Sequence, residues 1–274
     1  MRFSFPVSCE WLLTLRCNMS CSFCSTASTS YNEDYFFSND SLDAIVSNIK
    51  KSGCLYVALS GGEPLLHAQF FDILNFLKKA GLRVSLTSNG TLITEAIAYK
   101  LFCSNIDWVQ VTLLSSNYIE HDKIMGIDSH KKIIEAIKLL KRYNIGVTIC
   151  YTKTIEFSDE ESIKNIAVQM NADFITRNLL TVGCNHSEQH DDYIRDNKFK
   201  ISDRSSFAIL PDGTLKTCSE SKLVFGNIFS DDILSMYNNH SGFGKCIKND
   251  FKCIAELSWD NEKRAYEQLK KVRN

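Results

Sequence analysis

The sequence predicts an α/β protein built on a parallel sheet, for two reasons. Residues 1–180 alternate between short β-rich runs and amphipathic helical stretches, with short connections between them. Polar motifs also stand at the carboxyl ends of the first three expected strands: Cys17 and Gly61 follow the first two, and Ser88 ends the third. Parallel sheets place their sites at these carboxyl ends of strands, so the motifs and the alternation support the same fold.

The expected elements follow from composition and periodicity. Six strands are expected at residues 9–16, 55–60, 82–88, 107–113, 146–152 and 173–180. Helices are expected at residues 40–51, 67–80, 93–103, 130–143 and 159–170. In the helix at 130–143, for example, Ile133, Ile137 and Leu140 recur at helical spacing and form an apolar stripe. Six such β/α repeats predict right-handed crossovers between parallel strands.

The last third of the chain has a different pattern. Residues 181–204 are polar and lack periodicity, so they are expected to link a domain at 1–180 to a smaller region at 205–274. Residues 207–218 predict a β-hairpin with its turn at Pro211-Asp212-Gly213. A helix is expected at 231–237, and a charged amphipathic helix at 259–273.

Composition excludes several classes of protein. The chain has 274 residues and a formal net charge of -1, which gives no electrostatic reason to bind nucleic acid or an acidic membrane. No apolar run approaches the roughly 20 residues that span a bilayer. The first residues lack the apolar core of a signal peptide, so we expect a cytoplasmic protein. In that compartment the 11 cysteines favour metal ligation or catalysis over disulfides.

Three cysteines lie in one short loop after the first strand. Cys17, Cys21 and Cys24 have the spacing C-x3-C-x2-C. Three thiolates this close can hold three corners of an iron–sulfur cube and leave one iron without a protein ligand. A zinc knuckle or a chance group of thiols is the alternative. Zinc usually takes four ligands in paired spacings, and no partner pair follows nearby.

A second motif, Ser60-Gly61-Gly62-Glu63-Pro64, directly follows the second expected strand. Two glycines allow the backbone to approach a ligand closely. The neighbouring carboxylate can accept hydrogen bonds from an ammonium group. Such a turn is a weak signal alone, but its place one strand and one helix after the cysteine loop strengthens it.

Together these motifs resemble the radical S-adenosylmethionine superfamily, and the resemblance covers nearly all of residues 8–257. It implies a partial (β/α)6 TIM-like barrel and a 4Fe–4S cluster on Cys17, Cys21 and Cys24, with S-adenosylmethionine on the open iron. The residues that would contact this cofactor are Phe23, Gly61, Gly62, Glu63, Pro64, Ser88, Asn89 and Thr112. The family's Asp-Gly after the fourth strand is replaced by Leu114-Ser115, which weakens the transfer of any substrate role to that loop.

The resemblance also implies a reaction. An external one-electron reductant of the flavodoxin or ferredoxin type would drive reductive cleavage of S-adenosylmethionine. The resulting 5′-deoxyadenosyl radical would take a hydrogen atom from the substrate. The cofactor carries the difficult chemistry, and the protein supplies orientation and a dry cavity.

The C-terminal hairpin and the late cysteines are similar to the SPASM/twitch extension, in its one-cluster form. The resemblance implies an auxiliary cluster on Cys184, Cys218, Cys246 and Cys253. Their spacing departs from the family pattern, so a relic that has lost its metal is an alternative. A third option makes Cys184 or Cys218 a hydrogen-atom donor. The remaining cysteines are expected to behave as small hydrophobic residues: Cys9, Cys54, Cys103 and Cys150.

Three functions follow from these observations. The first is a radical enzyme that modifies a ribosomally made peptide by crosslinking, thioether formation or epimerisation. The second acts on a small molecule such as a sugar, an aminocyclitol or a nucleotide. The third is an iron–sulfur electron-transfer protein without catalysis, which the Gly-Gly-Glu-Pro motif disfavours because electron transfer needs no site for S-adenosylmethionine.

Overall fold

The computed structural model describes most of the chain. The described residues are 5–26, 28, 34–153, 159–178, 200–203, 206–219, 224–239, 245–249 and 252–253. Within them, no helix has both the length and the apolar character needed to cross a membrane.

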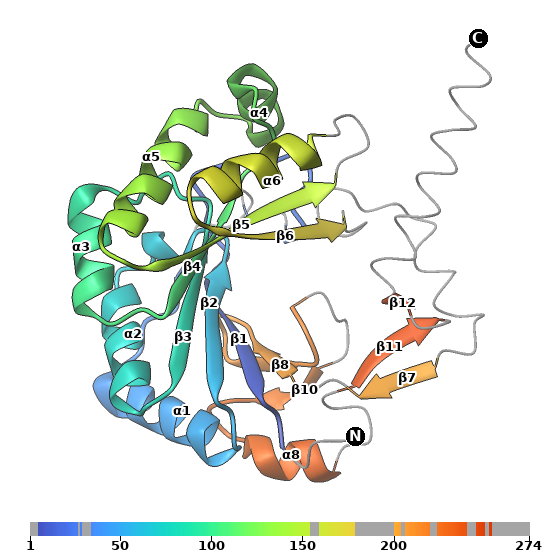
Figure 1. Ribbon diagram of the computed structural model, residues 1–274. Coiled ribbons are helices and arrows are strands. Elements are labelled where there is room, and N and C mark those ends of the chain that lie inside the picture. The colour runs from blue at the N-terminus through green and yellow to red at the C-terminus, as the bar shows by residue number, and fades with distance from the viewer. Residues whose placement is uncertain are drawn as a thin grey trace.

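Six parallel strands form the centre of the molecule (Figure 1). They are β1 (Ser8–Thr14), β2 (Tyr56–Gly61), β3 (Arg83–Ser88), β4 (Trp108–Thr112), β5 (Gly146–Lys153) and β6 (Asp173–Asn178). Each strand pairs in parallel with the next along the chain. The sheet does not close on itself, because its order runs from β10 at one edge to β6 at the other. The expected α/β partial barrel is therefore confirmed.

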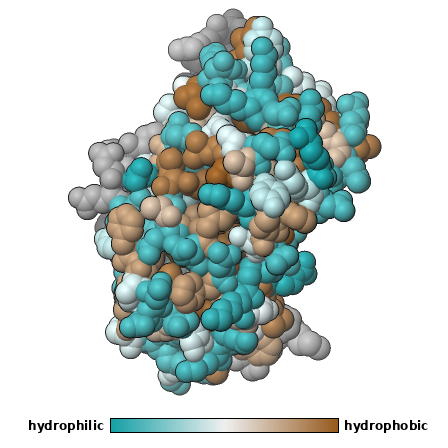
Figure 2. Space-filling model, turned by 90° about the vertical axis from the view of Figure 1, so that its left-hand side faces the viewer, coloured by the Kyte–Doolittle hydropathy of each residue, from teal (hydrophilic) through white to brown (hydrophobic). Residues whose placement is uncertain are grey.

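Helices connect these strands and cover one side of the sheet. They are α1 (Asn39–Lys51), α2 (Phe70–Lys79), α3 (Glu95–Cys103), α5 (His130–Arg142) and α6 (Glu160–Gln169). Helix α1 shows how the sequence specifies them: the Ser38 hydroxyl caps its first turn, and Leu42, Ile45 and Ile49 bury one face. Figure 2 shows the outer face, where hydrophilic side chains cover much of the surface with apolar ones between them.

Helix α2 begins at Phe70, three residues later than predicted, because residues 67–69 form a turn. A 3₁₀ turn at Pro64–Leu66 comes before it and ends at His67. Proline at the first position favours such a turn, because its ring fixes φ and it lacks an N–H to donate. The Gly-Gly-Glu-Pro motif therefore runs from the end of β2 into this 3₁₀ turn.

Helix α4 (Tyr118–Met125) was not predicted from the sequence. The Asn117 side chain caps its first turn, accepting from the Ile119 N–H at 2.9 Å, and Gly126 ends it with a left-handed φ of 75°. Its buried face includes His121 beside Ile124 and Met125, so apolar periodicity alone is too weak to reveal it.

The expected C-terminal hairpin is present and belongs to the main sheet. Strands β8 (Ser206–Ile209) and β9 (Thr214–Lys216) are antiparallel, and Gly213 has a φ of 82° in the turn between them. Strand β8 pairs in parallel with β1, with Cys9 opposite Phe207. An unexpected strand, β10 (Val224–Asn227), extends the sheet beyond β9. The pairing of β8 with β1 brings the hairpin beside the first strand of the barrel.

The remaining C-terminal elements are short. Helix α8 (Ile233–Asn239) is confirmed, and it docks on α1 through Asn48, whose Oδ1 accepts from the Ile233 N–H at 3.1 Å. A separate antiparallel sheet contains β7 (Lys200–Asp203), β11 (Lys245–Asn249) and β12 (Lys252–Cys253). Strand β7 lies inside the expected linker. The helix expected at 259–273 lies outside the described residues, and the boundaries at 180 and 205 stay predictions.

Alternation along the strands separates the core from the site. On β2, Val57 and Leu59 are fully buried in the core shared with the outer helices. Tyr56, Ala58 and Ser60 point to the other face and line a cavity. Because successive side chains alternate between the two faces of a strand, the outward positions hold the fold together and the inward positions are free for chemistry.

Candidate functional site

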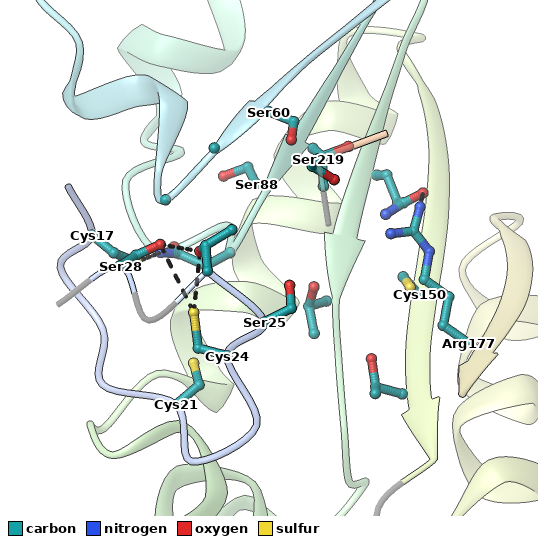
Figure 3. Close-up of a pocket in the computed structure, with 18 of the residues that line it drawn as sticks. Cys17, Cys21, Cys24, Ser25, Ser28, Ser60, Ser88, Cys150, Arg177 and Ser219 are labelled. Carbon is teal, nitrogen blue, oxygen red and sulfur yellow. Dashed lines mark hydrogen bonds between the residues drawn. The ribbon is translucent and has the colours of Figure 1, made fainter. Parts of the chain in front are cut away.

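The inner face of the sheet encloses a cavity of about 720 Å³. Side chains from all six parallel strands, the cysteine loop and the end of the C-terminal hairpin line it. Figure 3 shows the cysteine loop on one side of this cavity, and Cys150 and Arg177 on the other. The carboxyl ends of the strands converge here, as a barrel of this type requires.

Cys17, Cys21 and Cys24 line one end of the cavity. The Asn89 amide lies 3.8 Å from Cys17 Sγ, and Cys21 Sγ lies 3.8 Å from Met125 Sδ. The Cys24 N–H donates to the Cys21 carbonyl at 3.2 Å and so forms a turn between the two thiols. The loop therefore presents all three sequence-predicted ligands to one space.

Helix α4 supports this loop from behind. Met19 in the loop and Leu114, Ile124 and Met125 form a small buried apolar cluster. The helix also ends against the loop: a Cβ added at Gly126 would lie 2.4 Å from Ser20 Oγ. The helix that the sequence did not reveal thus packs, with this cluster, against Cys17 and Cys21.

The protein environment shifts the pKa values of Cys24 and Cys17 in opposite directions. Burial tends to raise the pKa of Cys24, but hydrogen bonds from Ser28 and Thr26 outweigh it and lower that pKa below its ordinary value. Burial raises the pKa of Cys17. Because the thiolate is the form that binds metal, Cys24 loses its proton for metal binding more readily than Cys17.

The three thiols line one space but do not converge on a single ion position. Among the described residues, no three His, Cys, Asp or Glu side chains converge closely enough to hold one metal ion. A zinc site needs such convergence, with bonds of about 2.3 Å from each sulfur to the same ion. In an iron–sulfur cube each cysteine binds a different iron, so more widely spaced thiols fit it.

Gly61 ends β2 and Gly62 follows it, and both lie close against the backbone at the end of β1. The N–H of Gly62 donates to the Thr14 carbonyl, and the N–H of Glu63 donates to the Arg16 carbonyl, both at 2.8 Å. A Cβ at Gly61 would lie 2.1 Å from Thr14 O, and one at Gly62 would lie 2.0 Å from Arg16 O. The close approach is therefore to the backbone leading into the cysteine loop. Both glycines also line the cavity, where their main-chain groups can meet a ligand.

Glu63 lies behind the cavity wall, which differs from the expected contact with an ammonium group. Its side chain is fully buried and accepts hydrogen bonds from Ser88 Oγ at 3.0 Å, from Asn89 N at 2.8 Å and from Leu65 N at 3.2 Å. Neither Glu63 nor Pro64 lines the cavity. The carboxylate instead ties the end of β2 to the end of β3 and positions Asn89.

Glu63 should make the stability of the chain depend on pH. Burial raises its pKa from 4.5 to about 7, so the folded chain binds this proton more tightly than the unfolded chain. The stability from this group is present below pH 4.5 and is lost as the pH rises through 7. We expect the free energy of unfolding to fall by up to about 1.4 kcal/mol per pH unit in that window.

Urea denaturation of iron-free protein between about pH 5 and 8 measures this slope. Glu63→Gln should flatten it, because the amide does not titrate. Glu95→Gln is the matched control, since Glu95 is 52% exposed on α3 and should leave the slope unchanged. Parallel profiles for the wild type and Glu63→Gln would contradict the assignment.

The other sequence-predicted residues fall into three groups. Phe23, Ser88, Asn89 and Thr112 line the cavity, as does Cys218. Cys246 and Cys253 lie on β11 and β12, opposite Ser202 and Lys248 in the strand register. Cys184 lies outside the described residues. An auxiliary cluster on these late cysteines stays a prediction.

The cysteines expected to act as small hydrophobic residues are mostly buried. Cys9, Cys54 and Cys150 are buried, although Cys150 also lines the cavity. Cys103 is exposed, so that prediction was wrong: the residue ends α3, where the last turn faces solvent.

Sequence reasoning missed several polar residues in the cavity. They are Glu10, Tyr56, Gln110, Arg177 and Ser219. One signal was available: Glu10 is a charged residue inside an otherwise apolar strand, and Gln110 stands two residues before Thr112 on the same inward face. Ser219 carried no such signal, because only the β1–β8 pairing brings it here.

The chain matches the family model described as the Radical SAM superfamily over residues 11–167. That stretch is more than half of the chain and includes the cysteine loop and the Gly-Gly-Glu-Pro motif. The chain belongs to the radical SAM superfamily. It is therefore an enzyme of that superfamily, and membership implies a 4Fe–4S cluster and S-adenosylmethionine as cofactors.

Two radical SAM relatives show how far the sequence similarity extends. The AdoMet-dependent heme synthase of Methanosarcina barkeri is 31% identical over 166 residues, which cover 57% of this chain and 48% of that protein. A probable GTP 3′,8-cyclase of Saccharolobus islandicus is 35% identical over 127 residues, which cover 46% and 41%. The chain thus spans about half the length of the curated relatives it matches.

Solved radical SAM structures share the fold more broadly. Streptococcus suis SuiB bound to its precursor peptide SuiA aligns with a TM-score of 0.70 and 17% identity, covering 89% of this chain and 67% of that one. The enzyme anSMEcpe with bound AdoMet aligns with a TM-score of 0.65 and 18% identity, covering 87% and 83%. At these identities the likeness concerns the fold.

Proposed function

We propose that this radical SAM enzyme holds its cluster on Cys17, Cys21 and Cys24 and takes a hydrogen atom from a substrate bound in the same cavity. The observation that carries the proposal is the shared lining: the three cysteines, the strand ends and a polar far end all face one space. When bound, the cluster and S-adenosylmethionine supply the radical chemistry, through reductive cleavage driven by an external reductant such as a flavodoxin or ferredoxin.

The chain's own residues would orient S-adenosylmethionine along the strand ends. Gly61 and Gly62 offer main-chain groups, Ser88 and Asn89 offer a hydroxyl and an amide, and Thr112 offers another hydroxyl. Phe23 lies in the cysteine loop, where it can pack against the adenine. Because an alkyl radical attacks whatever is nearest, precise orientation by these groups would decide which hydrogen is taken.

A ribosomally made peptide is the first candidate substrate. The observation in its favour is the fold shared with SuiB, whose structure contains a precursor peptide. Crosslinking, thioether formation and epimerisation all begin with removal of a hydrogen atom from a peptide residue. Cys218, which lines the cavity, would then ligate an auxiliary cluster or return a hydrogen atom to the substrate radical.

A small molecule is the second candidate. The cavity of about 720 Å³ falls in the range of ligand sites, roughly 300–1,000 Å³, and part of it must hold the cofactor. Charged and polar side chains line its far end, and the curated relatives are named as a heme synthase and a probable GTP 3′,8-cyclase. These observations favour a compact polar substrate, or a single residue of a peptide, at that end.

Formation of 5′-deoxyadenosine is the decisive test of the reaction. Anaerobically reconstituted protein, a strong reductant and S-adenosylmethionine should yield 5′-deoxyadenosine in a chromatographic assay, and the rate should rise when the correct substrate is added. A candidate peptide should lose two hydrogen atoms on crosslinking, or gain deuterium from solvent on epimerisation. An intact cluster without any cleavage would instead favour the electron-transfer alternative.

A further inference from the structure

The far end of the cavity contains two opposite charges that the proposed cofactor contacts do not use. Glu10 lies on β1 and Arg177 on β6, the first and last of the six parallel strands, and both line the cavity. Figure 3 shows Arg177 across the cavity from Cys21 and Cys24. We call Glu10 and Arg177 the charged pair.

Glu10 is held as an acceptor. The hydroxyls of Ser60 and Ser219 donate to its two carboxylate oxygens at 2.8 Å and 2.9 Å. These donors come from β2 and from the end of the C-terminal hairpin, so two separate elements fix the carboxylate. None of the ion pairs found among the described residues involves Glu10. A carboxylate fixed in this way still has lone pairs for an ammonium group or a hydroxyl.

Arg177 is also fixed from behind. Its Nη2 donates to Gln110 Oε1 at 3.1 Å, and Gln110 is only 9% exposed. No carboxylate pairs with Arg177 within the described part of the chain. The guanidinium keeps further donors in a planar fork that matches a carboxylate or a phosphate. Gln110 also lines the cavity, so it stands beside any anion that Arg177 would bind there.

Tyr56 lies within electrostatic reach of both charges. Its hydroxyl is 2.6 Å from Ser85 Oγ, and its ring stacks on Trp108 with centroids 4.8 Å apart. Burial raises the pKa of Tyr56 most, Glu10 raises it further, and Arg177 lowers it. Tyr56, Glu10 and Arg177 all line the same cavity.

Glu10 and Arg177 line the same cavity without pairing directly. Glu10 is half-buried and Arg177 is exposed, so both side chains can meet a ligand that enters the cavity from solvent. A ligand with complementary groups would pair both charges at once. The same ligand would be held opposite the cysteine loop, where a hydrogen atom could be removed.

We infer that the charged pair binds a dipolar substrate, with an ammonium group toward Glu10 and a carboxylate or phosphate toward Arg177 and Gln110. The inference rests on the proposed function and adds the chemical class of its substrate. The dipolar group can come from a free amino-acid-like molecule or from neighbouring basic and acidic side chains of a peptide.

The test measures binding to the reconstituted enzyme with S-adenosylmethionine already bound. The first set of probes contains ω-amino acids from glycine to 6-aminohexanoate, together with O-phosphoethanolamine. The second set contains alkanoates and alkylamines of matched length, which carry one charge each. A capped lysine–glycine–aspartate tripeptide represents the peptide source. Anaerobic calorimetry gives each dissociation constant.

At least one dipolar probe should bind about tenfold or more tightly than its singly charged counterparts, as expected for one charge-assisted hydrogen bond. Arg177→Gln and Glu10→Gln should each remove this advantage. Arg142→Gln and Glu95→Gln are the matched controls, because that ion pair lies on the helical surface with side chains 60% and 52% exposed. Preference for the capped tripeptide would identify the peptide source, and preference for a free probe the small-molecule source.

Two outcomes would overturn the inference. In one, no dipolar probe binds better than its singly charged counterparts, a comparison that needs no variant to fold. In the other, Arg177→Gln or Glu10→Gln weakens S-adenosylmethionine binding to the same extent, which would assign the charges to the cofactor. Both outcomes are separate from the proposed function, since 5′-deoxyadenosine formation by the wild type is measured in the same preparations.

Discussion

Replacement of Cys17, Cys21 and Cys24 by alanine is expected to abolish cleavage of S-adenosylmethionine and to remove about four irons per chain. These three thiols line one end of the cavity, beside the ends of the parallel strands. Without them the chain has no ligands with which to place an open iron beside the strand ends. The loss of activity should therefore be complete and not partial.

Iron and sulfide analysis of the wild type and the triple variant, both reconstituted anaerobically, measures this effect. About four irons that remain in the variant would establish an auxiliary cluster on the C-terminal cysteines, and none would exclude it. Cys103→Ala is the matched control, because this exposed thiol ends α3 and lines no part of the cavity. A triple variant that still forms 5′-deoxyadenosine at the wild-type rate would contradict the assignment.

The second large effect is expected from Gly62→Ala. The new Cβ would lie 2.0 Å from the Arg16 carbonyl oxygen and 2.6 Å from its carbon, and backbone cannot move aside as a flexible side chain can. The ends of β1 and β2 would have to separate, which would break the two hydrogen bonds between them and displace the cysteine loop. We expect a loss of about 3 kcal/mol in the free energy of unfolding, the upper end of typical overpacking costs.

Gly81→Ala provides the control for this variant. Gly81 has a left-handed φ of 80°, but the nearest atom to an added Cβ is Lys50 Nζ at 3.9 Å. It should lose only about 1 kcal/mol, from backbone strain without a clash. Urea denaturation compares the two variants, and S-adenosylmethionine binding should weaken only in Gly62→Ala. Equal losses would mean that the β1–β2 contact tolerates a methyl group.

Local patterns in the sequence predict the barrel well. The strands are short and apolar and the helices carry clear stripes, so β1 to β6 and their helices follow from periodicity with small errors at the ends. The cysteine spacing and the Gly-Gly-Glu-Pro motif predict the position of the site, because parallel strands bring their carboxyl ends together. The prediction of the barrel and the prediction of the site's position both depend on residues that are close in sequence.

Features that depend on tertiary contacts could not be predicted in this way. Helix α4 has a buried face that includes His121, so its pattern is weak, although its contact with the cysteine loop is essential to the site. Glu63 was expected to face a ligand, and only the position of β3 shows that Ser88 and Asn89 occupy its oxygens. The charged pair joins strands from opposite ends of the barrel.

The pairing of β8 with β1 has a consequence for how the protein is made. Ser219 completes the wall at Glu10, although the two residues are 209 positions apart in the chain. A ribosome releases the cysteine loop long before it makes the segment that closes the cavity beside it, since chains emerge from the N-terminus onward. For most of synthesis the thiols therefore stand on an unfinished barrel. Contacts of such long range also form slowly, so the site should be among the last parts of the molecule to become native.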